Sequence, residues 1–145
     1  MKALIQRVKS ASVTIDNALY SKINHGLLVF LGVEKSDTTE NADKLADKIV
    51  RLRIFEDENE KMNLSLQDIS GEMLIVSQFT LCGDCKKGTR PSFDKSAPPQ
   101  VANELYEYFI AKIKEYEVPV KTGVFGAMMD VELVNDGPVT FWIEK

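Results

Sequence analysis

The apolar and polar positions of the chain alternate in short segments that are typical of β-strands. Residues 4–8 and 11–15 are two β-rich runs, and the second alternates in polarity. Residues 27–33 are continuously apolar, which predicts a strand covered on both faces. Residues 73–76 predict another buried strand, and this one leads into a polar segment that begins at Ser77.

Two segments carry apolar residues at helical spacing. The segment 37–40 fits a capping box, with Asp37 as the N-cap and Glu40 three residues later. A second helix is expected to begin after Ser96, at Pro98-Pro99, because proline is tolerated in a first helical turn. The predicted buried stripes are Ala42, Leu45, Ala46, Ile49 and Leu52 in the first helix, and Val101, Leu105, Phe109 and Ile113 in the second.

The last third of the chain returns to strand patterns. Residues 129–134 and 139–143 alternate in polarity on either side of Asn135-Asp136-Gly137-Pro138. Asp-Gly is a strong hairpin signal. The proline that follows removes a backbone donor and allows a cis bond, so the segment could also present rigid carbonyl oxygens to a ligand. With no repeat or linker, residues 1–145 predict one compact α/β domain of mostly antiparallel strands, packed as layered sheets or a barrel-like core with two helices.

Charge and composition exclude several classes of protein. Lys and Arg total 18 and Asp and Glu total 22, a net charge of −4, which argues against a protein that coats nucleic acid. A local basic segment remains: Lys86, Lys87 and Arg90 against Asp84 could meet phosphate or form a solvated loop. No apolar run approaches the ~18 residues of a membrane span, and no signal peptide is recognisable. We expect a cytoplasmic protein that does not contact the membrane.

Three groups of residues are candidates for chemistry. Cys82 and Cys85 form a C-x-x-C, but two cysteines and one distant histidine are too few for a zinc site, and the sequence around them is typical of a loop. His25 lies in a turn with no nucleophile beside it, so a hydrolase mechanism here would lack a histidine base. Ser77-Gln78-Phe79-Thr80 ends a buried strand, where it could form a pocket floor with backbone oxyanion donors or simply run into solvent.

Two segments together resemble the signature motifs of the D-aminoacyl-tRNA deacylase family. They are Ser77-Gln78-Phe79-Thr80-Leu81 and Asn135-Asp136-Gly137-Pro138-Val139-Thr140. The resemblance extends over nearly the whole chain, through residues 5–8, 11–14, 26–29, 61–64, 90–93 and 141–142. Cys82 and Cys85 are not part of the family's pattern, so their role stays open.

The resemblance implies an enzyme that hydrolyses the ester bond of D-aminoacyl-tRNA without a metal or cofactor, and that also accepts glycyl-tRNA. It implies a homodimer in which the Gly137-Pro138 loop, with a cis bond, enters the partner's site and holds the substrate's α-amino group. An L-amino acid would direct its side chain into that loop and be excluded.

The resemblance also assigns roles to individual residues. The backbone N–H groups of Phe79 and Thr80 are the oxyanion donors, and Ser77 and Gln78 belong to the same substrate-binding segment. Arg7 fixes the Gly137-Pro138 loop, and Phe125 and Met129 line the adenosine pocket. No base is visible to activate the Thr80 hydroxyl, so we favour assistance by the ribose 2′-hydroxyl. A non-catalytic RNA-binding module and a thiol oxidoreductase using Cys82 and Cys85 are the alternatives.

Overall fold

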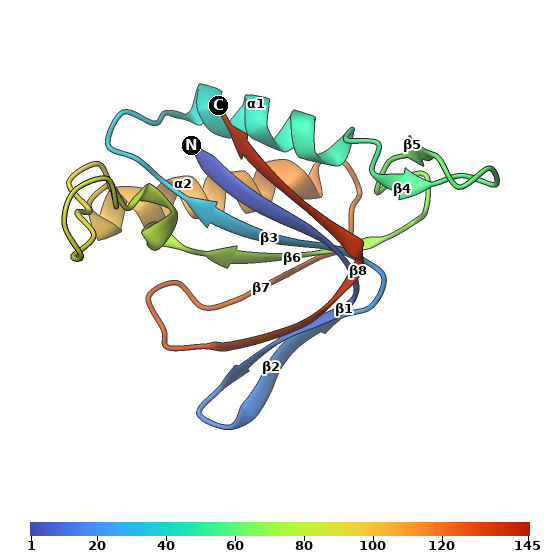
Figure 1. Cartoon of the computed structure of the whole chain (residues 1–145), viewed down its shortest axis with the longest axis horizontal. Helices are drawn as coiled ribbons and strands as arrows, with labels where there is room; N and C mark the ends of the chain where they lie inside the picture. Colours follow the sequence, from blue (N-terminus) through green and yellow to red (C-terminus); the bar gives the residue numbers. More distant parts are fainter.

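A strongly curved six-stranded sheet forms the body of the molecule in the computed structural model, which describes residues 1–145 (Figure 1). Two helices cover one side of it. In chain order the elements are β1 (Lys2–Ile15), β2 (Ala18–Ile23), β3 (Gly26–Gly32), α1 (Thr39–Val50), β4 (Phe55–Glu56), β5 (Met62–Leu64), β6 (Glu72–Ser77), the 3₁₀ helix η1 (Phe79–Cys82), α2 (Pro99–Lys114), β7 (Val120–Thr122) and β8 (Asp130–Glu144).

The sheet nearly closes into a barrel because the long strand β1 pairs with different strands along its two halves. Its first half pairs antiparallel with β3, its second half with β2, and β8 follows it along both halves. Beyond β3 come β6 and β7, each parallel to its neighbour. The far edges meet where Ser21 Oγ of β2 donates a hydrogen bond to the Thr122 carbonyl of β7 (2.8 Å). The predicted α/β class, with mostly antiparallel strands in a barrel-like core and two helices, is confirmed.

Alternate residues of β3 enter two separate cores. Leu27 and Val29 are fully buried in a cluster of 25 residues that also contains the apolar faces of α1 and α2. Leu28 points the other way, into a cluster of seven residues shared with Val8 and Ile23 inside the curled sheet. The continuously apolar segment is therefore a strand covered on both faces, as its pattern predicts.

The helix boundaries differ in detail from those that the pattern predicts. The N-cap of α1 is Thr38 rather than Asp37, and the Asn41 side chain, not Glu40, accepts the Thr38 N–H (2.9 Å). Leu52 lies beyond the helix, which ends at Val50.

Of the four residues predicted for the buried stripe of α2, Leu105, Phe109 and Ile113 are buried and Val101 is not. Val101 is 41% exposed. It lies in the first turn, at the margin of the buried face and about 100° around the axis from Ala102. That face consists of Ala102, Leu105, Tyr106, Phe109, Ile110 and Ile113.

The hairpin interpretation of residues 135–138 is wrong. The chain does not reverse there: Asn135 pairs with Val8, Thr140 pairs with Gln6, and β8 continues along β1 in the same direction. Four residues of β8, 136–139, therefore stand opposite the single residue Arg7, and they form a wide bulge. Figure 1 shows the strand bending sharply about halfway along its length. Likewise, residues 4–8 and 11–15 are one strand rather than two.

No helix of the structure combines the length and the apolar composition needed to span a membrane.

Candidate active site

A cavity of about 660 Å³ opens at the carboxyl end of β6. The segment after β6 forms one side of it, α2 forms another, and the connection between β7 and β8 forms a third. Most of its lining is apolar. The lining residues are Leu31, Val33, Val76, Ser77, Gln78, Phe79, Phe93, Ser96, Ala97, Pro99, Ala102, Tyr106, Phe125, Gly126, Ala127, Met128, Met129 and Val131.

The polar segment at the end of β6 bends into a short 3₁₀ helix. The Gln78 N–H still donates to the Leu31 carbonyl (2.8 Å), and the chain then turns through Phe79–Cys82. The first N–H groups of such a turn have no acceptor within it. They belong to Phe79 and Thr80, which are exposed. The cavity rim thus offers backbone donors, which is what oxyanion stabilisation requires.

The Thr80 hydroxyl has no base beside it. Its one hydrogen-bond partner is the Gln78 side chain, whose Nε2 donates to Thr80 Oγ1 (2.5 Å), and a carboxamide N–H cannot accept a proton. His25, the single histidine, directly precedes β3, at the end of that strand remote from Ser77, and it contacts Phe55 and Asp136. The arrangement therefore contains no nucleophile–base pair around Thr80.

Aromatic and thioether side chains form the apolar walls of the cavity. Tyr106 is 1% exposed, and its hydroxyl donates to the Ile75 carbonyl (2.8 Å). Burial raises the pKa of this phenol well above its ordinary value. The Tyr106 ring packs against Phe125, with centroids 5.9 Å apart. Met129 Sδ lies 3.4 Å from the Val124 nitrogen, so this contact joins the two ends of the β7–β8 connection.

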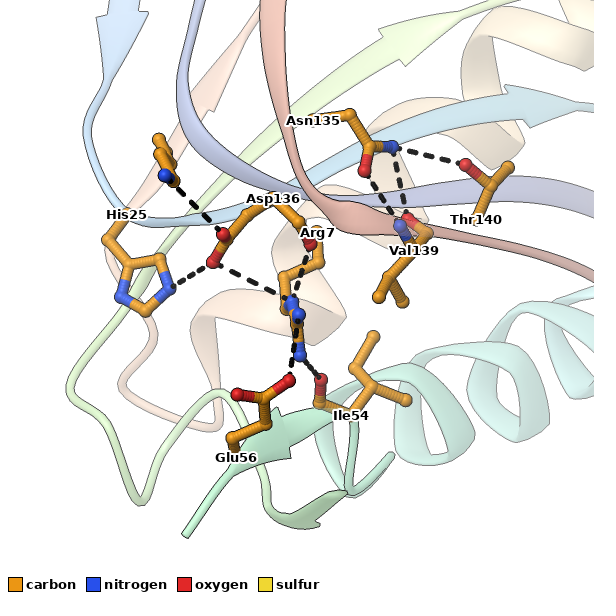
Figure 2. A network of polar contacts seen from close by, with 9 residues as sticks. Arg7, His25, Ile54, Glu56, Asn135, Asp136, Val139 and Thr140 are labelled. Atoms are coloured by element: carbon orange, nitrogen blue, oxygen red, sulfur yellow. Dashed lines mark hydrogen bonds and ion pairs between the residues drawn. The ribbon is translucent and has the colours of Figure 1, made fainter. Parts of the chain in front are cut away.

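The bulge of β8 is held by a separate polar network, which Figure 2 shows. Arg7, 4% exposed, donates from Nε to the Asp136 carbonyl (2.9 Å) and from Nη1 to the Ile54 carbonyl (2.7 Å). Its guanidinium also faces the carboxylates of Glu56 (3.4 Å) and Asp136 (3.7 Å). Arg7 thus ties the bulge to the segment that leads into the β4–β5 hairpin.

The tip of the bulge is exposed and carries little side chain. The Gly137–Pro138 peptide bond is cis, and Gly137 has φ 140°. A Cβ added at Gly137 would lie 2.7 Å from Val139 Cγ2 and 3.1 Å from Arg7 Nη2. Only glycine fits this backbone conformation in this space.

The two motifs lie at opposite ends of the sheet. Arg7, beside the bulge, pairs with Leu27 at the start of β3, whereas Ser77 pairs with Leu31 near its end. Those rows are four residues apart, about 13 Å along the strands, and β8 and β6 are separated by three strand spacings of about 4.8 Å. The larger cavity accordingly includes Ser77, Gln78, Phe79, Phe125 and Met129 but none of Arg7, Gly137 and Pro138.

A second, polar cavity of about 490 Å³ lies beside the bulge. It is lined by Arg7, Lys9, His25, Phe55, Glu56, Ile69, Asp136 and Gly137. The Asp136 carboxylate lies 3.6 Å from His25 Nε2 and 3.9 Å from Lys9 Nζ. The residues around Asp136 are therefore part of what holds the bulge.

The two cysteines are not arranged as a redox pair. Both are free; Cys82 is buried, and its thiol lies 3.5 Å from the Val33 carbonyl, whereas Cys85 is exposed. Burial raises the pKa of the Cys82 thiol, the opposite of what activates a catalytic cysteine. No group of three or more His, Cys, Asp and Glu side chains is placed to hold a metal ion.

Some contributors to these sites carry no signal in the sequence. Tyr106 and Phe93 line the larger cavity, but in a sequence they are ordinary aromatic residues. Taken residue by residue, Asn135 and Asp136 have only the pattern of turn residues, although both make contacts that hold the bulge; the family motif over residues 135–140 is the signal that points to them.

Comparison with known proteins places the chain in a family. Residues 4–144 match the family model described as D-Tyr-tRNA(Tyr) deacylase. D-aminoacyl-tRNA deacylases from Geotalea daltonii and Thermosipho africanus are 62% and 59% identical to the chain. The alignments cover 99% and 100% of this chain and 96% and 97% of those proteins.

Solved structures agree on the fold. A c-Myc DNA unwinding element binding protein superposes with a TM-score of 0.95 at 40% identity, over 100% of this chain and 99% of the other. A probable eukaryotic D-amino acid tRNA deacylase superposes with a TM-score of 0.82 at 18% identity, over 99% of this chain and 98% of the other. At that identity the likeness supports the fold alone. The chain belongs to the D-Tyr-tRNA(Tyr) deacylase family, a family of hydrolases, and the resemblance drawn from its motifs is confirmed.

Proposed function

We propose that this chain hydrolyses the ester bond of D-aminoacyl-tRNA and releases the free D-amino acid and the tRNA. The observation that carries the proposal is the 62% identity to a D-aminoacyl-tRNA deacylase over nearly the full chain. The cavity at the end of β6 supports it, because apolar walls around exposed backbone donors suit a nucleoside ester. Free thiols and the need for aminoacylated tRNA suit a cytoplasmic location.

The proposed chemistry relies on positioning and on backbone donors. The terminal adenosine lies against Phe125 and Met129, and the ester carbonyl faces the N–H groups of Phe79 and Thr80. These groups stabilise the oxyanion of the tetrahedral intermediate. Because Thr80 has no base, the ribose 2′-hydroxyl of the substrate assists the attack of water. An activated ester needs less help than an amide, so this set of groups is sufficient.

Selectivity for the D-isomer is assigned to the Gly137-Pro138 bulge of a second copy. The two motifs are far apart within one chain, so they can act on one substrate only if each site combines the pocket of one copy with the bulge of another. Carbonyl oxygens of the bulge receive the α-amino group. The side chain of an L-amino acid would collide with the bulge, whereas glycine has none and would be hydrolysed too.

The free edge of β8 supports a homodimer. β8 has 15 residues and pairs only with β1, which leaves its other edge without a partner strand. Val134 (53%), Phe141 (39%) and Trp142 (50%) are exposed on it. A long free edge with exposed apolar side chains is a feature that proteins usually cover. A second copy packed along β8 covers this edge and brings the bulge close to another molecule.

The acceptor end of the tRNA would meet a local basic surface. Lys86, Lys87 and Arg90 are exposed on the loop that follows η1, and none of them forms an ion pair. The net charge of the whole chain is −4, so we expect few phosphate contacts. The binding constant should therefore fall only slowly as salt is added, with a slope of log K against log salt concentration of about −0.7 per phosphate neutralised. A steep slope would contradict this docking.

The direct test compares matched D- and L-tyrosyl-tRNA. The enzyme should release D-tyrosine and leave the L-ester at its background rate. Equal hydrolysis of both would refute the proposed function. Binding of the tRNA without any hydrolysis would favour the RNA-binding module, and loss of the activity on changing Cys82 and Cys85 to Ser would favour the thiol enzyme.

The role of Thr80 is tested by Thr80→Ala. Because the backbone N–H remains, we expect the variant to keep most of the activity. A substrate with a 2′-deoxy terminal adenosine should instead be hydrolysed about 10²-fold more slowly. Near-complete loss in a folded Thr80→Ala protein would identify the hydroxyl as the nucleophile. Inhibition by a chelator would contradict the metal-free chemistry.

The composite site is tested by complementation between two inactive variants. Gly137→Val blocks the bulge, and Phe79→Pro removes one backbone donor at a first helical position, where proline is tolerated. Each alone should be inactive. After subunit exchange, mixed dimers contain one intact site, so roughly a quarter of the wild-type activity should return. No recovery, with exchange demonstrated by mass spectrometry, would place both motifs in one chain's site.

A further inference from the structure

The bulge of β8 lacks the hydrogen bonds that a strand would normally provide. Residues 136–139 have no partners on β1, since the pairing jumps from Asn135–Val8 to Thr140–Gln6. Gly137 and Pro138 are exposed at the tip, and Val139 returns to the interior at 7% exposure. A buried peptide group without partners costs about 1–3 kcal/mol, so something must satisfy Val139.

The side chain of Asn135 takes the place of the missing strand. Its Oδ1 accepts the Val139 N–H (2.7 Å), and its Nδ2 donates to the Val139 carbonyl (3.2 Å). Nδ2 also donates to Thr140 Oγ1 (3.2 Å). Figure 2 shows these three contacts bridging the two ends of the bulge. The Val139 N–H fixes which end of the carboxamide is oxygen.

We propose that Asn135 is a positioning residue that determines selectivity for the D-isomer. Its carboxamide closes residues 136–138 into a ring, and Arg7 anchors the Asp136 carbonyl from outside that ring. The two contacts together fix where the tip carbonyls point. This inference rests on the proposed role of the bulge in recognising the substrate.

The chemistry of the contact explains why asparagine is required. One planar group must accept from an N–H and donate to a carbonyl on the same residue, as a neighbouring β-strand does. Aspartate has the same shape and keeps the acceptor, but it has no donor when ionised. Leucine has a similar volume and neither function. Glutamine carries one more methylene, which moves the amide away from Val139.

The experiment compares Asn135→Asp and Asn135→Leu with the wild-type dimer, on D- and L-tyrosyl-tRNA. We measure L-ester hydrolysis above background at enzyme concentrations that hydrolyse the D-ester completely. The ratio of D to L hydrolysis should fall about 10-fold or more in Asn135→Leu and by less in Asn135→Asp, since misplacing a recognition group by about 1 Å has effects up to 10². Thr140→Val removes the third contact and the Gln6 Nε2 hydrogen bond to the same oxygen (3.3 Å) but leaves both Asn135 contacts to Val139, so it is the matched control and should keep the wild-type ratio.

The outcomes separate this inference from the proposed function. If the wild-type enzyme does not distinguish the isomers, the proposed function fails. If it does, and both Asn135 variants keep its ratio within about twofold whatever their rate, the positioning role is refuted. A role in stability alone would lower the melting temperature without any change in the ratio. Should Asn135→Leu fail to fold, Asn135→Asp carries the same comparison.

Discussion

Removing the buried guanidinium of Arg7 should destabilise the protein more than any other single change to its polar groups. The Arg7 side chain is 5% exposed and donates to two carbonyls on different segments. A lysine keeps the charge, but its ammonium donates from a single point and cannot reach acceptors on both sides of the planar guanidinium. Arg7→Lys therefore loses at least one of these two hydrogen bonds.

The expected loss of folding free energy follows from the groups that Arg7 contacts. A charge-assisted hydrogen bond to a carbonyl contributes about 1.5–3 kcal/mol. The carboxylates of Glu56 and Asp136 are 50% and 29% exposed, so solvent reduces each ion pair to about 1 kcal/mol or less. We expect Arg7→Lys to cost about 2–4 kcal/mol and Arg7→Met about 3–5 kcal/mol. For a chain of this size, each kcal/mol lowers the melting temperature by roughly 2–8 °C.

Equilibrium unfolding in urea at a fixed protein concentration measures this effect. Lys9→Met is the matched control, because Lys9 faces the same Asp136 carboxylate from 3.9 Å but is 68% exposed. That change should cost about 0.5 kcal/mol or less. The reasoning is refuted if Arg7→Lys lies within about 0.5 kcal/mol of the wild type, or if Lys9→Met is as costly as Arg7→Met.

Three further predictions concern other parts of the molecule. Burial raises the pKa of Tyr106, so the unfolded chain releases this proton first and the free energy of unfolding should fall as the pH rises above about 10. Titrated unfolding should show that Tyr106→Phe reduces this slope by up to ~1.4 kcal/mol per pH unit; an unchanged slope would contradict the burial. Iodoacetamide at pH 8 should label Cys85 and spare Cys82 in the native protein, giving one adduct by mass spectrometry, whereas two would show that Cys82 is accessible. Gly26→Ala should cost about 3 kcal/mol or more in urea unfolding, because its Cβ would lie 1.9 Å from the Glu72 carbonyl oxygen; near-wild-type stability would disprove that close approach.

Elements whose signal lies within one segment could be predicted from the sequence. The apolar run over β3 gave a strand buried on both faces, and Ala42, Leu45 and Ile49 gave the inner face of α1. Pairing across distant segments could not be predicted in this way. Periodicity does not reveal that β1 is long enough to pair with both β2 and β3. That length is what allows the sheet to curl into a barrel.

The Asp136-Gly137 dipeptide shows most clearly what a local sequence pattern cannot predict. Local turn chemistry is the same for a hairpin and for a bulge, since both need a residue that tolerates unusual φ. What differs is the partner: β1 offers acceptors and donors on both sides of Arg7, so β8 gains more by resuming the same ladder than by reversing. That choice depends on a strand more than a hundred residues away in sequence, and no local pattern contains it.

The same pairing decides how the candidate site is divided. Because β8 continues along β1 past the bulge, the bulge lies at the row of Arg7, where β3 begins, while Ser77 ends β6 at the row of Leu31. A hairpin at 135–138 would have left the later half of β8 free to pair elsewhere, including near the end of β6. The continuous ladder removes that freedom and places the glycine-proline tip on a rigid support remote from its own pocket. If both motifs act on one ester, the register of β1 and β8 therefore makes assembly of two copies a condition for activity.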